Sequence, residues 1–589
     1  MKNRKILLLI LYLPVLLLLP STAKAQGINI SSGVSITFTG TAFLEITNGD
    51  FVNNGTYAKG TETVIFSGNT ANTITGNNTD MYNLSITNTG GITTRVGLLA
   101  TNNLTVASGS KLTIDPAKAV TVSGTLTNNT GTEGLIIKSD AAGTASLIHH
   151  TDNVPATVER YISGDAEAWH FLSSPVAAQS ISGIWTPSGS YGNGTGYDLY
   201  LWNEPNNCWI YKLDATSTIN WNTVHSDTAF VVGRGYLYSV QATNPTKEFV
   251  GTINNGTISY GLTFSSTDAN LKGFNLVGNP YPSSIDWQAT LGWTRSNLVS
   301  SGNGYDMWIW NPTANNYGVF NSATGSGTNF VTGNIAPMQG YFVRAAGAGN
   351  LSLDNTVRIH DSAGSWRKAE INPDMLSLFV QSATDNSFDE SRLLFGYASN
   401  QSGTIKLFSH VVTAPSLFIA SGGEYYSVRY LTDTVDNPMV PVMFKPGQDG
   451  DYTLRCNFDF NKFETVMLED RQTHSIQNMK IEQAYSFKAL KTDDADRFIL
   501  YFGPVINNSD KEFPATIYSD GIRLIVDLTL ISKETDIFVY DLMGQILLQQ
   551  KLQGEIKHYL NFNAKVQILI VYLKNSNGSL CQKLLWKGN

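Results

Sequence analysis

Short stretches in which apolar and polar residues alternate recur along the first quarter of the chain. Each stretch ends at glycine, asparagine or serine residues. Alternation with a period of two is typical of a β-strand that buries one face. Strands this short and this closely spaced predict a β-solenoid or a flat β-sandwich for residues 26–158. The clearest examples are Val34–Phe38, Leu84–Ile86, Leu104–Val106, Leu112–Ile114 and Val120–Val122.

A tandem duplication occupies the middle of the chain. Three segments return in the same order, 105, 108 and 105 residues later: Trp169–Pro175 as Phe274–Pro280, Gly196–Asn203 as Gly304–Asn311, and Gly235-Tyr236 as Gly340-Tyr341. A period of this length is that of a small domain and is too long for one turn of a solenoid. The sequence therefore predicts two copies of one β-module, at residues 159–262 and 263–368.

Two further β-regions follow the duplication. Alternating runs such as Leu376–Val380 predict an antiparallel β-sandwich for residues 369–505. The apolar positions Ile522, Leu524, Val526 and Leu528 alternate cleanly and belong to a small closing domain at residues 506–589. The predicted fold class is all-β throughout.

Composition agrees with several β-domains and excludes one class of partner. The 589-residue chain is 42% hydrophobic and only 15% charged, below the roughly 25% charge of an average domain. Its net charge of −8 is not accompanied by clusters of lysine and arginine. Because nucleic acid is bound through such clusters, we expect no nucleic-acid partner.

Residues 1–25 have the pattern of a secretory signal. Basic residues precede an apolar stretch, and the small residues Ala23 and Ala25 form a cleavage site before Gln26. A membrane anchor is the alternative. The apolar run is shorter than the ~20 residues that a spanning helix needs, and Pro14 interrupts it. We therefore expect no transmembrane segment in the mature chain.

The sequence contains no motif for catalysis, a cofactor or a metal. The histidines are isolated and are expected to be ordinary surface or core residues. The three cysteines are too far apart to form a disulfide framework, although two of them could pair. The residues concerned are His149, His150, His170, Cys208, Cys456 and Cys581.

Some acidic residues also invite a functional interpretation. Asp449 and Asp451 could bind calcium, but the rest of a calcium loop is missing, so a solvated turn is favoured. Asp389-Glu390 and the acidic run at residues 493–496 are predicted to be solvated turns as well.

Trp202 and Trp310 occupy equivalent positions in the two copies. An exposed indole can stack on a sugar ring, so the pair could form a glycan platform. Large aromatic residues are more often buried in a core or between modules. Packing is therefore the favoured interpretation, and glycan binding is the alternative.

The closing domain carries a recognisable set of residues. Ile517-Tyr518-Ser519 is followed by Val539-Tyr540-Asp541-Leu542-Met543-Gly544, and Lys583 lies in the last predicted strand. This region resembles the C-terminal sorting domain of the Bacteroidetes type IX secretion system. Members of that family usually carry a Gly-Ile/Val-Tyr strand near the end, where this chain has Val566-Gln567-Ile568. The resemblance implies an immunoglobulin-like sandwich that the outer-membrane export machinery reads. Gly273–Pro282 is similar to modules of surface proteins of the same phylum.

Together these features predict a non-enzymatic protein that adheres or displays. It is expected to pass through the periplasm and to be secreted or held at the outer cell surface. Its implied partner is the type IX machinery, with surface glycans or matrix as further partners and no cofactor. One alternative is a carbohydrate-binding accessory or a polysaccharide-active secreted enzyme. The other is a scaffold that assembles through exposed sheet edges.

Overall fold

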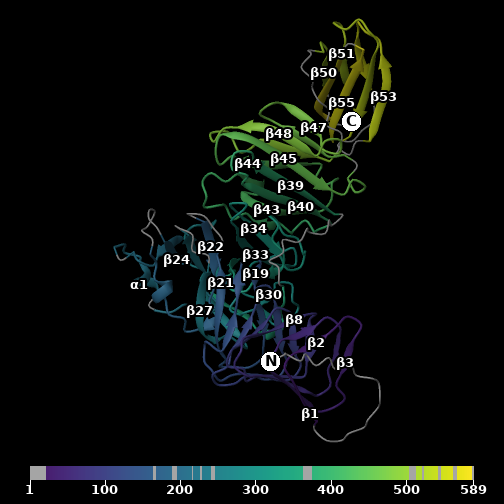
Figure 1. The fold of residues 1–589 in the computed structure, drawn as a ribbon. Coiled ribbons are helices and arrows are strands. Elements are labelled where there is room, and N and C mark those ends of the chain that lie inside the picture. Colours follow the sequence, from purple (N-terminus) through teal and green to yellow (C-terminus); the bar gives the residue numbers. More distant parts are fainter. Residues whose placement is uncertain are drawn as a thin grey trace. The chain divides into compact units, whose positions relative to one another are not determined.

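The computed structural model describes residues 21–162, 168–188, 196–214, 216–225, 228–240, 246–361, 374–463, 465–502, 513–519, 523–541, 545–561, 567–576 and 578–586. Nearly all of the described elements are strands, which confirms the all-β prediction (Figure 1). The chain forms two compact units. The first comprises residues 1–300, 304–312 and 320–368, and the second comprises residues 301–303, 313–319 and 369–589.

The first unit begins with a parallel β-solenoid, one of the two predicted architectures. Strands of successive turns pair in parallel and build three main sheets, besides a short parallel pair between Ser35–Thr37 and Thr56–Ala58. The first sheet contains β1 (Ser21–Ala25), β4 (Ala42–Thr47), β7 (Thr63–Ser67), β10 (Asn83–Ile86), β13 (Leu104–Val106) and β16 (Leu126–Asn128). The second contains β2 (Ile28–Ile30), β5 (Phe51–Asn53), β8 (Asn72–Gly76), β11 (Ile92–Thr94), β14 (Leu112–Ile114) and β17 (Leu135–Ile137). The third contains β9 (Thr79–Met81), β12 (Leu98–Ala100), β15 (Ala119–Val122) and β20 (Ser146–Ile148).

Register explains how such short strands build a core. Leu44, Val64, Leu84, Leu104 and Leu126 pair in one line across five turns, and all are buried. Because neighbouring side chains of a strand point to opposite faces, every turn places its apolar positions inside. The solenoid interior is therefore a set of stacked aliphatic ladders.

Asparagine residues connect the turns at the corners. Asn48 Oδ1 accepts a hydrogen bond from the Asn69 amide one turn later at 2.7 Å. Asn103 Oδ1 likewise accepts from the Thr125 amide at 2.9 Å. These bonds satisfy backbone donors that no strand reaches, which explains the asparagine-rich turns.

The solenoid passes directly into the first copy of the duplicated module. β21 (Pro155–Tyr161) pairs in parallel with β17 of the last turn and antiparallel with β27 (Thr246–Ile253). β27 also pairs with β23 (Val176–Ala177). The expected boundary at residue 158 therefore falls within a strand that belongs to both parts.

The two copies contain sheets with the same strand order. In the first copy the order is β22 (Ala168–Leu172), β26 (Tyr236–Val240), β24 (Tyr197–Asn203) and β25 (Cys208–Tyr211). In the second copy the corresponding order is β29 (Phe274–Gly278), β36 (Gly340–Arg344) and β33 (Gly304–Asn311). The remaining elements up to residue 361 are β3 (Ser35–Thr37), β6 (Thr56–Ala58), β18 (Ser139–Asp140), β19 (Gly143–Thr144), η1 (Gly183–Trp185), η2 (Glu204–Asn206), α1 (Trp221–Val224), β28 (Ile258–Leu262), β30 (Ser284–Asp286), β31 (Trp293–Thr294), β32 (Ser300–Ser301), β34 (Asn316–Asn321), β35 (Asn334–Ile335), β37 (Gly349–Leu353), η3 (Asn355–Val357) and β38 (Arg358–Ile359).

The two copies contact each other through reciprocal backbone pairs. Leu172 of the first copy bridges to Gln339 of the second, and Val277 of the second bridges to Arg234 of the first. Each of these residues lies 105 positions from its counterpart (172 and 277, 234 and 339). An approximate two-fold axis therefore exchanges the two contacts, as at a symmetric dimer interface.

Hydrogen bonds at this interface repeat the same symmetry. The Ser173 amide donates to Met338 O at 2.9 Å, and the Gly278 amide donates to Gly233 O at 2.9 Å. These donors and acceptors are again 105 positions apart (173 and 278, 233 and 338). The two duplicated modules therefore pack against each other pseudo-symmetrically.

A cluster around Arg358 holds the second copy on the last turns of the solenoid. The Arg358 guanidinium donates to Leu147 O at 2.8 Å and to His149 O at 2.7 Å, and it lies over the Tyr281 ring. His360 hydrogen-bonds Ser146 Oγ at 2.8 Å through Nδ1 and Thr121 Oγ1 at 2.7 Å through Nε2. Arg358 and His360 therefore contact the solenoid at β15, at β20 and in the segment that follows β20.

The second unit contains an eleven-stranded sheet. Its elements are β39 (Met375–Ser382), β40 (Phe388–Phe395), β41 (Gly403–Ile405), β42 (Ser416–Ser421), β43 (Glu424–Leu431), β44 (Met439–Lys445), β45 (Gly450–Phe458), β46 (Met467–Asp470), β47 (Ser475–Asn478), β48 (Ala484–Ala489) and β49 (Phe498–Tyr501). β46 and β48 lie near opposite ends of the strand order, yet Tyr485 of β48 hydrogen-bonds Asp470 of β46. The sheet therefore folds over a core, as the predicted sandwich requires.

The closing region has a core of its own between two small sheets. One sheet contains β50 (Thr516–Ser519), β51 (Leu524–Asp527) and β54 (Lys557–Leu560). The other contains β53 (Ile546–Leu552), β52 (Thr535–Tyr540), β55 (Gln567–Asn575) and β56 (Gly578–Trp586). This arrangement agrees with the predicted immunoglobulin-like sandwich.

Glycine at the centre of the module interface is a testable requirement. A Cβ at Gly340 would lie 2.8 Å from the Phe171 Cβ of the other copy, whereas a Cβ at Gly347 would meet nothing within 4 Å. We expect Gly340→Ala to lower the free energy of unfolding by about 1–3 kcal/mol through overpacking. Gly347→Ala should leave it unchanged or slightly raised. Urea unfolding measures both variants. Equal free energies of unfolding would show that the interface does not require glycine at position 340.

Acid should weaken the joint between the solenoid and the second copy. Burial, together with the charge of Arg358, lowers the pKa of His149 to about 3 and that of His360 to about 4. Both imidazoles are therefore neutral in the folded state at pH values where the unfolded chain binds protons. The contribution of these two neutral imidazoles to the free energy of unfolding is complete above pH ~6.5 and is lost as the pH falls toward 4.

Thermal melts between pH 7 and pH 4.5 test this dependence. His360→Gln should flatten the decline in melting temperature of the first unit, while His558→Gln on β54 should not. If the melting temperature of His360→Gln fell with pH as steeply as that of the parent protein, His360 would not be the cause of the acid sensitivity.

Candidate functional site

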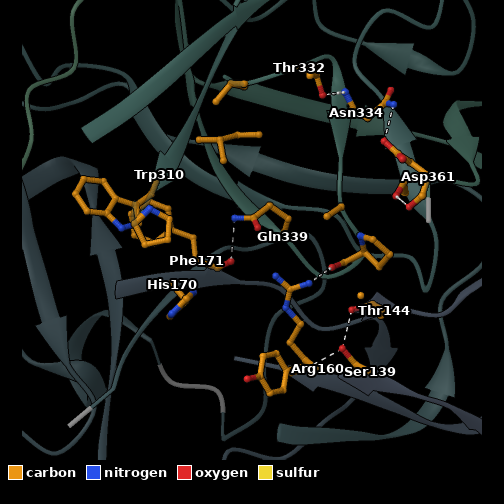
Figure 2. Close-up of a pocket in the computed structure, with 18 of the residues that line it drawn as sticks. Ser139, Thr144, Arg160, His170, Phe171, Trp310, Thr332, Asn334, Gln339 and Asp361 are labelled. Carbon is orange, nitrogen blue, oxygen red and sulfur yellow. Dashed lines mark hydrogen bonds between the residues drawn. The ribbon is translucent and has the colours of Figure 1, made fainter. Parts of the chain in front are cut away.

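A cavity of about 370 Å³ opens in the first unit where the end of the solenoid meets both copies. The β18–β19 hairpin, the end of β21, the start of β22 and the end of β33 all contribute to its wall. Figure 2 shows Arg160 in the middle of the lining, with Phe171 and Trp310 to one side and Asn334 and Asp361 to the other. Its volume lies within the roughly 300–1,000 Å³ of sites for small ligands.

Aromatic residues form one side of the cavity. Phe171 and Trp310 are buried, and Trp169 is partly exposed. The Trp169 ring stacks on Tyr200 at a centroid distance of 6.4 Å and meets the Trp209 ring edge to face at 6.0 Å. These contacts fix the orientation of Trp169, so the wall is preformed.

Phe330 lines the cavity in an uncommon conformation. Its side chain is 48% exposed, and its φ is +63°, directly after Asn329 at +49°. A bulky side chain seldom adopts a positive φ, which costs of order 1–3 kcal/mol. The fold therefore holds an aromatic ring out at the cavity at the expense of backbone strain.

The polar part of the lining consists mainly of neutral groups. Asn334 Nδ2 donates to Asp361 Oδ2 at 2.8 Å, and Gln339 Nε2 donates to Gly340 O at 2.8 Å. Ser139 Oγ and Thr144 Oγ1 are 2.8 Å apart across the β18–β19 hairpin. Hydroxyl and amide groups of this kind can both donate and accept hydrogen bonds.

Arg160 is the one arginine or lysine in the described lining. It is partly buried, and its Nη1 donates to Pro337 O at 3.3 Å. Its Nε is buried and has no hydrogen-bond partner among the described residues. Burial alone lowers the pKa of this guanidinium to about 10, so Arg160 remains charged near neutral pH.

The two predicted tryptophans occupy different environments. Trp202 is half-buried between the copies, where its Nε1 donates to Phe274 O at 2.7 Å and its ring meets Phe342 edge to face. Trp310 is 4% exposed and lies in the cavity wall. Both positions agree with the packing interpretation, and Trp310 also lines the cavity described above. Sugar stacking on this pair stays a prediction.

The predicted cleavage site lies at the start of the solenoid. Ala23 and Ala25 belong to β1 and pair with Leu44 and Ile46 of β4, and Gln26 follows the strand. The rest of the predicted signal, residues 1–20, lies outside the described residues. Cleavage before Gln26 stays a prediction.

The described part of the sorting signature lies at the end of β52 in the closing sandwich. Val539 and Tyr540 end β52, and Asp541 Oδ1 accepts from the Gln545 amide at 2.9 Å. The Gln545 carbonyl accepts from the Asp541 amide at 3.1 Å, which closes the turn into β53. Leu542 and Gly544 lie outside the described residues. The role of this turn in sorting stays a prediction.

The described residues include no group of three or more His, Cys, Asp or Glu side chains that could hold a metal ion. Cys208, Cys456 and Cys581 form no disulfide in the structure. Asp449 Oδ1 accepts from the Lys491 amide at 2.6 Å, and Asp451 pairs with Lys488 at 2.9 Å. Across the described ranges, no helix is long and apolar enough to cross a membrane.

The prediction of a solvated turn at Asp389-Glu390 is wrong. Both residues lie in β40, with Asp389 fully buried and Glu390 5% exposed. Lys406 pairs with Asp389, and Arg392 Nε donates to Glu390 Oε1 at 2.7 Å. These buried carboxylates are tolerated because the neighbouring cations Lys406 and Arg392 neutralise them. Lys406 is too distant in sequence for a local pattern to reveal it.

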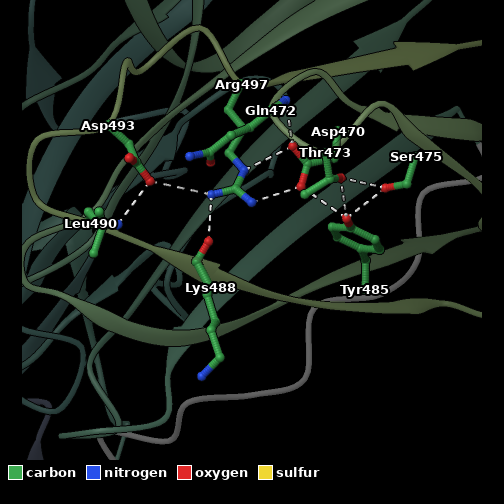
Figure 3. Close-up of polar contacts among 9 residues, drawn as sticks. All are labelled: Asp470, Gln472, Thr473, Ser475, Tyr485, Lys488, Leu490, Asp493 and Arg497. Carbon is green, nitrogen blue, oxygen red and sulfur yellow. Dashed lines mark hydrogen bonds and ion pairs between the residues drawn. The ribbon is translucent and has the colours of Figure 1, made fainter.

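A second polar cluster lies inside the sandwich of the second unit (Figure 3). Arg497 donates to both oxygens of Asp470, at 3.1 Å and 2.8 Å, and Tyr485 donates to the same carboxylate at 2.9 Å. Burial would raise the pKa of Asp470, but the hydrogen bonds and charge of Arg497 outweigh it and lower the pKa. Arg497 also donates to Lys488 O at 2.8 Å. With its charges matched, this cluster is structural.

The sequence profile of a family described as "Domain of unknown function (DUF8693)" matches residues 67–502. No curated protein matches the chain in sequence. A solved structure titled "Biofilm associated protein - BSP domain" aligns at 9% identity over 77% of this chain and 94% of that chain, with a TM-score of 0.11. A TM-score this low supports no conclusion about this chain.

Removing one partner of the buried pair should destabilise the second unit. Asp470→Asn removes the carboxylate that accepts two hydrogen bonds from the buried Arg497 and leaves Arg497, among the described residues, only the longer ion pair with Asp493 at 3.8 Å, so we expect a loss of about 3 kcal/mol in the free energy of unfolding. Asp496→Asn removes the exposed partner of Arg471 and should have little effect. Scanning calorimetry measures both variants, and similar melting temperatures would contradict the structural role of the cluster.

Proposed function

We propose that this chain, which belongs to the DUF8693 family, is a non-enzymatic adhesion or display protein of the outer cell surface or the extracellular space. The observation that carries the proposal is the construction of the first unit. A parallel solenoid is joined to a duplicated module through a shared sheet and through Arg358. Stacked turns form a stiff element, so the module and its cavity are presented on a rigid support.

The chemistry of the described residues supports a binding role over catalysis. The cavity combines aromatic rings, neutral polar groups and one arginine. A hydrolase of sugars would need two carboxyl groups that flank the scissile bond. Asp361 in the lining is hydrogen-bonded to Asn334, and the exposed Asp140 accepts from the Ala142 amide. The lining is therefore better suited to holding a ligand than to reacting with it.

Export is the second part of the proposal. The pattern of residues 1–25 supports passage to the periplasm, and the resemblance of residues 506–589 supports type IX sorting. The closing sandwich buries its own apolar core, including Ile517, Val539 and Trp586. A region with a separate core can act as an address without contributing to the stability of the rest.

Deleting residues 506–589 tests the sorting role. We expect the truncated protein to accumulate in the periplasm while residues 26–505 keep the melting temperatures of the full chain. A control variant, Leu530→Ala, changes a side chain that is 77% exposed in the same region and should reach the surface normally. Cell fractionation with melting curves separates the outcomes. Surface delivery of the truncated chain would falsify the sorting role.

The non-enzymatic part is tested separately with purified protein and a panel of polysaccharides. Binding without turnover is the expected result. Release of shorter saccharides would contradict the proposal and favour a polysaccharide-active enzyme. Light scattering on the same samples tests the alternative of a self-assembling scaffold. The particle mass of a scaffold would increase with protein concentration, whereas that of a single adhesive molecule would not.

A further inference from the structure

The charge of Arg160 is not compensated by the described part of the protein. An arginine side chain has five N–H donors, and Arg160 makes one hydrogen bond, to Pro337 O. The fully buried arginines are better satisfied than this partly buried one. Arg358 donates to four acceptors, and Arg497 pairs with a carboxylate. A partly desolvated cation without a carboxylate partner is costly, and such a charge in a cavity is a candidate for contact with a ligand.

The two carboxylates of the described lining are hydrogen-bonded to groups other than the Arg160 guanidinium. Asp361 is held by Asn334, and Figure 2 shows this pair apart from the guanidinium. Asp140 is exposed and accepts from the Ala142 amide within its own turn. The electrostatics of the cavity therefore favour an anion at Arg160. The guanidinium geometry suits a carboxylate, which can accept two parallel hydrogen bonds.

The rest of the lining indicates which class of ligand would bear this carboxylate. Trp169 is partly exposed and fixed in place by Tyr200 and Trp209, and Phe330 is held at the cavity in a strained conformation. Aromatic faces of this kind pack against the C–H face of a sugar ring. Thr332, Asn334 and Gln339 supply groups that can hydrogen-bond hydroxyls. Strain kept at a cavity is typical of a functional site.

We propose that this cavity binds an acidic sugar, with Arg160 contacting the carboxylate and Trp169 and Phe330 contacting the ring. The proposal deepens the adhesive function proposed above and rests on it for its biological meaning. It assigns acidic polysaccharides, such as polymers of uronic acids, as the class of surface that the protein adheres to. A peptide with a terminal carboxylate shares the charge but lacks the ring hydroxyls.

Isothermal titration with the purified full chain tests the ligand class. The probes are a galacturonic acid trisaccharide and the matched neutral galactose trisaccharide. We expect the acidic probe to bind about tenfold or more tightly than the neutral one, because charge-assisted hydrogen bonds are lost with the carboxylate. Arg160→Met should abolish this preference. Arg95→Met should keep it, because Arg95 is an exposed solenoid residue paired with Asp115.

Melting temperatures separate binding from folding. Arg160→Met removes an uncompensated, partly buried charge, and Phe330→Gly relieves a positive φ, so neither variant should melt below the parent protein. Both should nevertheless bind the acidic trisaccharide more weakly. A structural role for either residue would instead lower the melting temperature and leave the affinity of the folded protein unchanged.

Three results would overturn the proposal. They are equal binding of the two trisaccharides, full binding by Arg160→Met, and tighter binding of a short peptide with a free carboxyl terminus, which would assign the cavity to peptides. The titration uses purified protein and does not depend on export. Failure of surface delivery would therefore leave this inference standing, and failure of binding would leave the sorting result standing.

Discussion

The reciprocal contact between the two module copies is the constraint on which the first unit depends. Because Leu172 meets Gln339 while Val277 meets Arg234, each copy supplies the edge that the other needs. Gly235 and Gly340 allow the backbones to approach at the centre, where a Cβ would collide with the opposite copy. The cavity forms beside this contact, since Phe171 and Gln339 both line it. The contact that relates the two copies by symmetry therefore also forms part of the cavity wall.

The solenoid imposes a second constraint, because a stack of parallel turns must end without exposing its core or its strand edges. Here β21 and β27 extend one sheet into the first copy, and Arg358 satisfies carbonyl groups near the last turn from the second copy. The module therefore acts as the cap of the solenoid. The buried histidines at the same joint explain why acid should act there first.

The sequence predicted much of the fold but little of the site. Period-two alternation and repeated turn residues limited the first region to a solenoid or a flat sandwich, and the nearly constant offset of 105–108 residues was sufficient for two similar modules. Gly235 and Gly340, repeated at that offset, are a sequence signal of the close approach, which the pattern alone could not distinguish from turn glycines. The cavity was missed because Arg160, Trp169 and Phe330 come together only in three dimensions. The error at Asp389-Glu390 has the same cause, since its compensating Lys406 lies 17 residues further along the chain, just after β41.

Hydrogen exchange of two backbone amides tests the reciprocal contact most directly. The Ser173 and Gly278 amides donate across the interface at 2.9 Å in symmetric positions. If the copies form one cooperative unit, both amides should be strongly protected and should exchange at the same slow rate, set by opening of the whole first unit. Protection of one amide and rapid exchange of the other would show that the copies open independently, which contradicts the account.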